Sequence, residues 1–379
     1  MKVAEHEALA PGETMARLYT DSMDEVAKEI YTLTLQGPKS VNLMSWLKEV
    51  YTVSTASALY GPHNPFKSSE ELVQAFWDYD SGLKMLVLDL FPAITIPKAL
   101  KGREKVVQAL RQFLKDNVNG RDGYAETVRN RLNANAKHAC SEDSNARSEL
   151  GLLSGLLINT VPVTFWMVAH ILSSESLHSA IMSEISNVVE AGDGSEAHFR
   201  YIDVSAIKES CPILVSTYRE VLRVAGAATA TLSVEEDTLL DKRYLLKKGS
   251  IVQIPTNSVH ADTEVWGSDA GDFNPERFDQ SRKSFKKHHP SAFRTFGGGV
   301  GLCPGRHLAM DEVTTFTALV LYTFDISPGG SAASFQLPQK NTTSLGSIMN
   351  PIGSFDVTLS CREGLKGVVW KFGAKDQIT

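Results

Sequence analysis

A glycine-rich segment late in the chain reads Phe296-Gly297-Gly298-Gly299-Val300-Gly301-Leu302-Cys303-Pro304-Gly305-Arg306-His307-Leu308-Ala309. Glycine lacks a Cβ atom and reaches backbone conformations that other residues avoid, so this density of glycine predicts a tight loop. We expect left-handed backbone at Gly297, Gly298, Gly299 and Gly301.

A helix is predicted directly after this loop. Pro304 suits the first helical turn, and apolar residues follow at helical spacing, namely Leu308, Phe316, Leu319 and Leu321. Cys303 would then lie at the positive end of a helix, where backbone N–H groups favour a thiolate. We interpret Cys303 as the axial ligand of a haem iron, with Phe296 shielding its sulfur from water.

Other uses of such a loop fit less well. A phosphate-binding loop would end in Gly-Lys-Ser or Gly-Lys-Thr, and a zinc site would need further cysteines or histidines at short spacing. Neither pattern occurs around Cys303. Cys140, Cys211 and Cys361 are scattered singly, so the sequence predicts no disulfide framework and suits a reducing compartment.

The segment resembles the haem-binding signature of the cytochrome P450 family, Phe-x-x-Gly-x-Arg-x-Cys-x-Gly, except that Gly301 stands in the place of the arginine. The resemblance implies haem b as cofactor and Cys303 as the ligand of its iron. The residues implied to bind the cofactor are Phe296, Gly299, Cys303, Gly305 and Arg306.

Two further motifs of this family occur upstream. Glu220-Val221-Leu222-Arg223 lies in a segment with helical periodicity, so Glu220 and Arg223 share one helix face. Phe273-Asn274-Pro275-Glu276-Arg277-Phe278 resembles the family's Pro-Glu-Arg-Phe segment. The resemblance implies a buried triad of Glu220, Arg223 and Arg277, which is structural because buried charges persist only when paired. For His260, between these motifs, we prefer a satisfied turn histidine.

Residues 151–172 form a long apolar run that could span a membrane by length alone. Its polar residues and Pro162 favour a buried helix instead. In the family this helix crosses the haem, and an acid and a threonine relay protons to oxygen. Here Ile158 and Asn159 hold those positions, so Asn159 and Thr160 are the expected catalytic residues bordering the oxygen pocket. An amide hydrogen-bonds oxygen but does not shuttle protons as an acid does.

The pattern Asn-Thr-x-Pro-x-x-Phe-Trp, which ends at Trp166, resembles one branch of the family. That branch contains sterol 7α- and 12α-hydroxylases, prostacyclin synthase and fungal relatives. The Gly-Gly-Gly-x-x-Leu-Cys-Pro-Gly-Arg-His form of the loop leans toward filamentous-fungal members, many of which act in secondary metabolism.

Composition fits a soluble globular protein, with 42% hydrophobic and 22% charged residues and a net charge of −6. This balance offers no basic footprint for nucleic acid. No Gly/Ser/Pro-rich linker divides the chain, so we expect residues 1–379 to form a single cytochrome P450 domain, mainly α with small β-sheets. Helical periodicity dominates from Thr14 to Arg223, and short strands are predicted at 244–254 and 355–372.

Residues 1–30 are mixed and charged, with no hydrophobic anchor. The resemblance covers only the later part of the family's chain, so we expect a fold that lacks its N-terminal portion. It also implies the endoplasmic reticulum membrane, facing the cytoplasm. Basic groups that usually meet the haem carboxylates are replaced by Leu232 and Gly301, so haem affinity is expected to be weak unless Arg306 or His307 compensates.

The leading hypothesis is a haem-dependent monooxygenase that hydroxylates a lipophilic small molecule, using O2 and electrons from an NADPH-cytochrome reductase. A haem-thiolate isomerase or dehydratase that needs no external electrons is the first alternative, favoured by Ile158 at the acid position. An inactive truncated remnant is the second. The remaining pocket candidates are small and apolar, namely Val161 and the segments 227–231 and 348–352.

Overall fold

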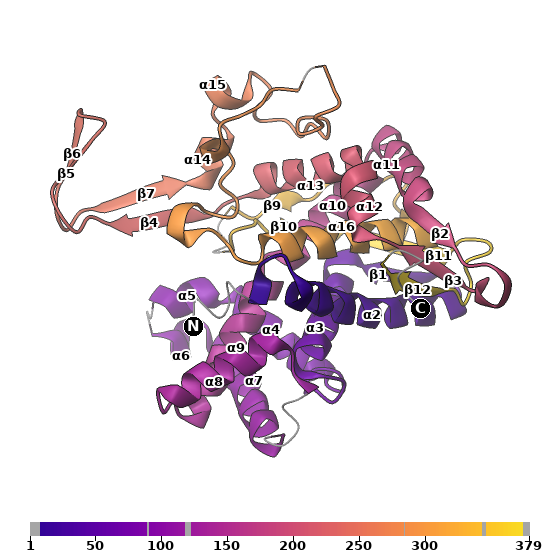
Figure 1. Ribbon diagram of the computed structural model, residues 1–379, viewed down its shortest axis with the longest axis horizontal. Coiled ribbons are helices and arrows are strands. Elements are labelled where there is room, and N and C mark those ends of the chain that lie inside the picture. The colour runs from indigo at the N-terminus through magenta and orange to yellow at the C-terminus, as the bar shows by residue number, and fades with distance from the viewer. Residues whose placement is uncertain (1–7, 89–90, 118–122, 284, 343–345, 374–379) are drawn as a thin grey trace.

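The computed structural model describes residues 8–88, 91–117, 123–283, 285–342 and 346–373, and it confirms a mainly helical fold with small sheets (Figure 1). The helices are α2 (Glu13–Leu35), α3 (Leu43–Tyr60), α4 (Glu70–Ser81), α5 (Leu83–Leu88), α6 (Pro92–Thr95), α7 (Pro97–Asp116), α8 (Glu126–Lys137), α9 (Glu142–Leu157), α10 (Thr160–Leu172), α11 (Glu175–Val188), α12 (Val204–Ser210), α13 (Pro212–Ala225), α14 (Thr256–His260), α15 (Thr263–Trp266) and α16 (Arg306–Thr323). The strands are β1 (Lys39–Asn42), β2 (Val189–Ala191), β3 (Phe199–Ile202), β4 (Thr229–Ser233), β5 (Thr238–Leu240), β6 (Tyr244–Leu246), β7 (Ile251–Pro255), β8 (Phe324–Pro328), β9 (Gln339–Lys340), β10 (Pro351–Ile352), β11 (Asp356–Cys361) and β12 (Val369–Phe372).

Several helices begin at a capping side chain. The caps are Asn42, Ser69, Ser141 and Ser174, each of which accepts a hydrogen bond from the backbone N–H three residues later. Such a cap satisfies one of the backbone donors that the first turn leaves without an intrahelical partner. These polar residues therefore mark where α3, α4, α9 and α11 start.

Helix α10 forms the centre of the core. Residues 160–171 are buried on every side of the helix, which packs against α3, α13 and α16. A helix that is apolar all round must be covered by other elements. The segment Glu142–Leu172 is long and apolar enough to cross a membrane, yet 83% of its apolar window is buried inside the protein.

The predicted continuous helix over residues 151–172 is interrupted. Helix α9 ends at Leu157 and α10 begins at Thr160, with Asn159 at the N-cap position. Pro162 has no N–H to donate to the carbonyl of Ile158, whereas the Val163 N–H reaches the Asn159 carbonyl at 3.1 Å. The proline therefore explains why the helix is broken at Ile158 and Asn159.

The strands form small separate sheets. Strands β1, β11 and β8 make an antiparallel sheet, and β12, β3 and β2 make a mixed one. Each predicted strand region corresponds to two strands: β6 and β7 for 244–254, where β7 extends one residue further to Pro255, and β11 and β12 for 355–372. The hairpin of β4 and β7 projects from the helical body, with β5 and β6 at its tip (Figure 1).

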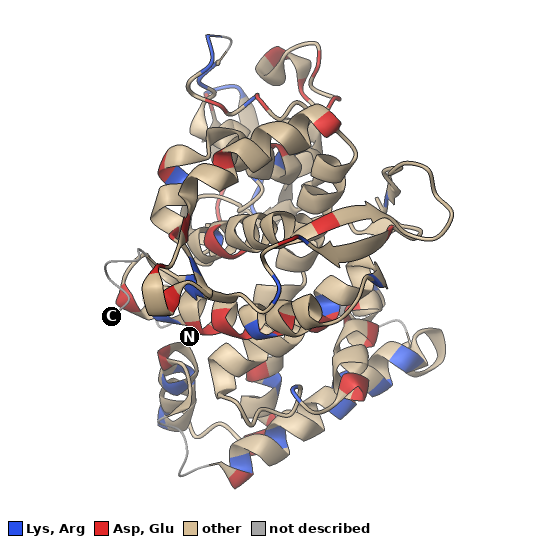
Figure 2. Ribbon diagram, turned by 90° about the vertical axis from the view of Figure 1, so that its right-hand side faces the viewer, with Lys and Arg blue, Asp and Glu red and all other residues tan. Residues whose placement is uncertain are grey.

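Helix α16 carries the predicted apolar residues into the core, since Leu308, Phe316, Leu319 and Leu321 are buried. It begins at Arg306, so Pro304 precedes the helix instead of occupying its first turn, and that prediction was wrong. Acidic and basic residues are interspersed along the outer helices (Figure 2).

Candidate functional site

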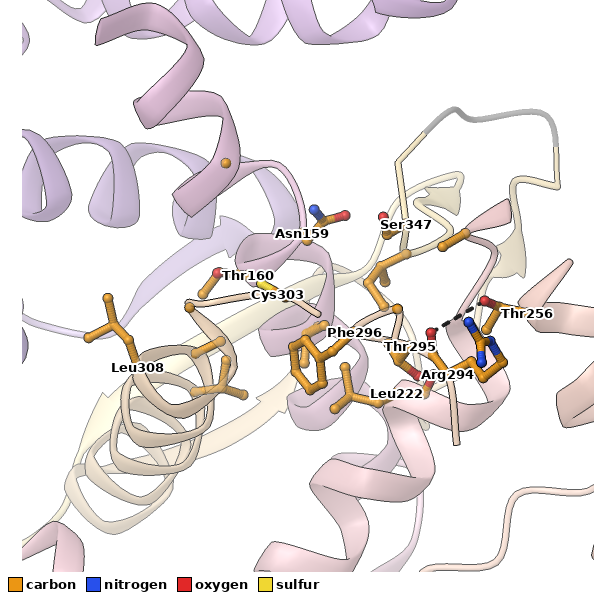
Figure 3. Close-up of a pocket in the computed structure, with 18 of the residues that line it drawn as sticks. Asn159, Thr160, Leu222, Thr256, Arg294, Thr295, Phe296, Cys303, Leu308 and Ser347 are labelled. Atoms are coloured by element: carbon orange, nitrogen blue, oxygen red, sulfur yellow. Dashed lines mark hydrogen bonds between the residues drawn. The ribbon is translucent and has the colours of Figure 1, made fainter. Parts of the chain in front are cut away.

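Cys303 faces a cavity of about 330 Å³ at the junction of α9, α10, α13 and α16 (Figure 3). Apolar side chains form much of its wall, including Val163, Leu222, Leu308 and Ile348. Asn159, Thr160, Phe296 and Gly305 also line it. The site therefore collects residues that lie almost 200 positions apart in the sequence.

The loop before Cys303 is closed by its own backbone. The Cys303 N–H donates to the Phe296 carbonyl at 2.9 Å, and the Gly297 N–H donates to the Arg294 carbonyl at 2.8 Å. Gly297 and Gly299 have positive φ angles of 78° and 59°. Left-handed backbone was also expected at Gly298 and Gly301, but Gly298 is extended and neither residue has a positive φ. Two glycines are enough because short hydrogen-bonded turns make the other bends.

The protonation state of the Cys303 thiol differs from the one that the sequence predicted. Burial raises its pKa above the usual value, and the Gly305 N–H and the Arg306 guanidinium only partly offset this effect. The expectation that the helix end would favour the thiolate was incomplete, because it left out desolvation. Without a metal, Cys303 is a protonated thiol at neutral pH, and metal binding would displace its proton.

Asn159 presents an unsatisfied polar atom to the cavity. Its Oδ1 atom is buried and has no hydrogen-bond partner among the described residues. Thr160 is also buried, and its carbonyl accepts a hydrogen bond from the Thr164 hydroxyl at 3.0 Å. A buried acceptor without a partner costs free energy, so it indicates a place where a ligand or water supplies the missing donor.

The three residues of the expected triad are in contact. The Glu220 carboxylate accepts from Arg223 Nη2 at 2.7 Å and from Arg277 Nε at 3.2 Å. Arg223 also donates to the carbonyls of His260 and Ala270, and Arg277 pairs with Asp269. Every charge thus has a partner, which is the condition under which buried ions are tolerated.

His260 connects this triad to the cysteine loop. Its Nδ1 atom lies 2.9 Å from the Arg223 carbonyl, and its Nε2 atom accepts the Arg294 N–H at 3.0 Å. Burial lowers the pKa of His260 to about 4, so the ring is neutral, with Nδ1 protonated to serve both bonds. His260 is satisfied, as preferred from the sequence, but it bridges two motifs instead of closing a local turn.

Sequence reasoning missed two charged residues that line the cavity. Arg294 and Glu312 are its only cation and acid among the described residues. Burial raises the pKa of Glu312 to about 7, although a hydrogen bond from Ser22 opposes the shift. Glu312 follows Leu308 by four residues and shares its helix face, a signal that could have revealed it.

Some residues expected to bind the cofactor lie elsewhere. Gly299 and Arg306 are not among the residues that line the 330 Å³ cavity. Arg306 instead donates to the Cys303 carbonyl at 3.0 Å and lines a second cavity, of about 380 Å³. Phe296 lines both cavities and so forms part of the wall between them. Leu232, which replaces a basic residue that usually meets a haem carboxylate, is 52% exposed on β4.

The described residues fit a haem. One thiol, on a glycine-rich loop, faces apolar walls suited to a flat macrocycle, and a single guanidinium is available for a carboxylate. The unsatisfied Asn159 Oδ1 atom marks a polar point within the same cavity. No group of three or more His, Cys, Asp or Glu side chains that could hold a metal ion occurs within the part of the chain that the structure describes.

Comparison with known proteins gives a consistent result. A family model described as Cytochrome P450 matches residues 6–353. The cytochrome P450 monooxygenase nodJ of Hypoxylon pulicicidum is 33% identical over 377 residues, which cover 97% of this chain and 72% of the relative. A cytochrome P450 monooxygenase of Gibberella zeae is 30% identical, over 94% of this chain and 70% of the relative.

Mammalian relatives match a shorter region. Cytochrome P450 7A1 of Oryctolagus cuniculus is 27% identical over 67% of this chain and 52% of the relative. The cholesterol 7-alpha-monooxygenase of Cricetulus griseus is 26% identical over similar shares. The sterol 7α-hydroxylase branch suggested by the Asn159–Trp166 pattern is thus represented among the relatives.

Proposed function

This chain belongs to the cytochrome P450 family, and from that premise we propose that it is a haem-dependent monooxygenase that oxidises a lipophilic small molecule. Its relatives include named monooxygenases, which make it an oxidoreductase of that class. The observation that carries the proposal is the Cys303 thiol, which a closed glycine loop presents to an apolar cavity.

Cys303 is the proposed axial ligand of haem b. A thiolate-ligated haem supplies the oxygen-activating chemistry of this family, because the thiolate favours cleavage of the O–O bond. The chain's own contribution is to release the Cys303 proton and to hold the sulfur anion. The Gly305 N–H and the Arg306 guanidinium, which lower the pKa of this thiol, are placed to do so. We propose Phe296 and Gly305 as further haem contacts.

We propose Asn159 and Thr160 as the polar residues beside the reacting atoms. The Asn159 amide can donate from Nδ2 and accept at Oδ1, so it can orient a hydroxyl group or a water molecule in the cavity. It cannot release a proton as a carboxylic acid does. Because Ile158 provides no acid either, protons are proposed to arrive through water.

The proposed substrate is a lipophilic small molecule, either a sterol or a secondary metabolite. The side chains of Val163, Leu222 and Ile348 offer it apolar surface, and burial of such surface drives binding of lipophilic ligands. One relative is named a cholesterol 7-alpha-monooxygenase. Of the small apolar residues considered from the sequence, Ala228, Ala230 and Ile348 line the cavity.

The proposed electron donor is an NADPH-cytochrome reductase. The second cavity lies on the Arg306 side of the cysteine loop, and its lining includes Arg219, Lys286 and Lys287. A basic surface attracts an acidic partner and speeds its association at low ionic strength. The double variant Lys286→Glu/Lys287→Glu should slow reduction by the reductase and remove its dependence on salt. An unchanged rate would exclude this docking site.

Residues 1–379 are proposed to act as one domain, because the larger hydrophobic core cluster includes residues from Leu9 to Phe372. By analogy with the family, we also propose that the protein works at the endoplasmic reticulum membrane. An isomerase or dehydratase remains the second candidate function. It is favoured by Ile158 at the position where the family carries an acid and by the neutral amide at Asn159.

The first experiment is spectroscopic. The haem-loaded chain and its Cys303→Ala variant are reduced under carbon monoxide, and a strongly red-shifted Soret band should appear only in the unmodified protein. Lack of that band would refute thiolate ligation. Turnover is then measured with and without NADPH and reductase, since a monooxygenase requires both and an isomerase requires neither.

A further inference from the structure

We propose that Arg294 binds a carboxylate of the cofactor and so replaces the basic groups that this chain lacks at Leu232 and Gly301. The inference rests on the proposed haem function. It concerns a residue that none of the sequence motifs includes, and four independent features of the structure support it.

First, the guanidinium of Arg294 has no partner among the described residues. No hydrogen bond or ion pair of this side chain occurs within the described residues, although the side chain is only partly exposed. Other arginines near the site have partners: Arg223 and Arg277 serve Glu220, and Arg306 donates to the Cys303 carbonyl. A partly buried cation without a partner is a binding site for an anion.

Second, the backbone of Arg294 is held at three points. Its N–H donates to His260 Nε2, and its carbonyl accepts from the Gly297 N–H at 2.8 Å. The Thr256 hydroxyl lies 3.5 Å from the same carbonyl. Such anchoring fixes where the side chain begins, and a preorganised arginine loses less conformational entropy when it binds a carboxylate.

Third, the neighbouring loop leaves room for the guanidinium. A Cβ atom on Gly298 would lie 3.2 Å from Arg294 Nη2 and 3.3 Å from Nη1. Glycine at this position therefore permits an approach that any other residue would crowd. Because Gly298 is extended, its lack of a side chain matters here for space and not for backbone conformation.

Fourth, Arg294 is the only cation that lines the cavity among the described residues, and it lies apart from the thiol. Figure 3 shows Arg294 beside Thr256 at one end of the lining residues, with Phe296 and Cys303 toward the other. A flat macrocycle bound through Cys303 has its carboxylates at its periphery. A substrate carboxylate could use the same guanidinium, so the test must separate the two sources.

The experiment compares two probes that differ only in charge. The chain is loaded with protohaem or with its dimethyl ester, and transfer of each to excess apomyoglobin is timed for the unmodified protein and for Arg294→Gln. The variant should release protohaem about 10- to 100-fold faster, as expected for loss of a charge-assisted hydrogen bond. Release of the uncharged ester should be equal in both proteins.

Arg294→Lys should still release protohaem more slowly than Arg294→Gln does, because lysine keeps the charge without the bidentate geometry. Arg243→Gln is the control, since Arg243 is exposed, lies over the Tyr244 ring and does not line the cavity. Thermal unfolding without haem checks that each variant folds.

Equal acceleration for protohaem and ester in Arg294→Gln would mean general loosening and would overturn the proposal. Unchanged release of both, together with weaker binding of a carboxylate-bearing substrate, would assign Arg294 to the substrate and also overturn it. If the unmodified chain retains neither probe and shows no thiolate spectrum, the proposed function itself fails, and this inference fails with it.

Discussion

Two parts of the cavity wall are built in different ways. The cysteine wall, which we define as residues 294–305 with their supports on α13 and α14, is dense in hydrogen bonds from Glu220 through His260 to the Cys303 loop. The asparagine wall, residues 158–163, is apolar apart from Thr160 and Asn159, whose Oδ1 atom has no partner among the described residues.

This difference indicates that the cysteine wall supports the site, whereas the asparagine wall takes part in binding and reaction. The hydrogen bonds that link Glu220, Arg223, His260 and the backbone of the cysteine loop hold one geometry, which a ligand to iron requires. A wall with an unsatisfied acceptor gives up some stability and keeps that acceptor available for a ligand. Substitutions that break the hydrogen-bonded network of the cysteine wall should therefore cost stability, whereas substitutions in the asparagine wall should cost function without destabilising the protein.

The largest effect is expected from Arg223→Ala. It leaves Glu220 buried with its main partner removed, and breaking a buried ion pair from one side costs about 3–5 kcal/mol. Urea unfolding should show this loss. Lys247→Ala is the control, because Lys247 and its ion-pair partner Asp237 are both exposed, so little change is expected there. Similar losses in both variants would contradict the special role of the triad.

The next effect depends on pH and concerns His260. Its pKa is about 4 in the folded protein and near its ordinary value of 6.5 when unfolded, so the unfolded state takes up the proton first as pH falls. Stability from this group is therefore present at pH 7 and should fall by about 2–3 kcal/mol toward pH 4.5. In His260→Gln this slope should vanish, whatever the variant's stability at pH 7. Urea midpoints for both proteins at several pH values measure it.

Glu312 should produce a slope of the opposite sign. Its pKa is about 7 when folded and 4.5 when unfolded, so the folded state holds the proton more tightly and loses stability as pH rises between these values. Glu312→Gln should gain about 2–3 kcal/mol over the unmodified protein between pH 5 and pH 8. The reverse trend, or none, would show that Glu312 is ionised at little cost in the folded protein.

A smaller effect distinguishes two glycines of the cysteine wall. Gly297 has a φ of 78°, and a Cβ atom there would lie 3.0 Å from the Gly301 carbonyl, so Gly297→Ala should cost about 1–2 kcal/mol. Gly301→Ala should cost little, because its φ is not positive and a Cβ atom there would meet open space. Comparison of their melting temperatures tests the assignment.

The smallest effect on stability, a gain, is expected in the asparagine wall. Asn159→Leu removes a buried acceptor without a partner and should raise stability by about 1 kcal/mol. Turnover of substrate should nevertheless fall, because the amide no longer orients groups in the cavity. A destabilised but fully active variant would reverse the contrast between the two walls.

Short-range features could be predicted from the sequence. The cysteine loop, the Glu220–Arg223 spacing and the apolar face of α16 each depend on residues within a few turns of one another, so covalent geometry and helical periodicity were sufficient to place them. The helical fold class followed for the same reason. The break between α9 and α10 was missed although Pro162, its local cause, was noticed.

Only the tertiary structure determined the chemistry of the cavity. The pKa of Cys303 is raised because distant segments bury the thiol, and no local pattern shows how much water is excluded. Arg294 and Glu312 meet the Asn159 region only after the chain folds, since they are separated from it by more than a hundred residues. The sequence by itself determined which groups are present, whereas desolvation and long-range packing decided which of them are charged, satisfied or free to bind.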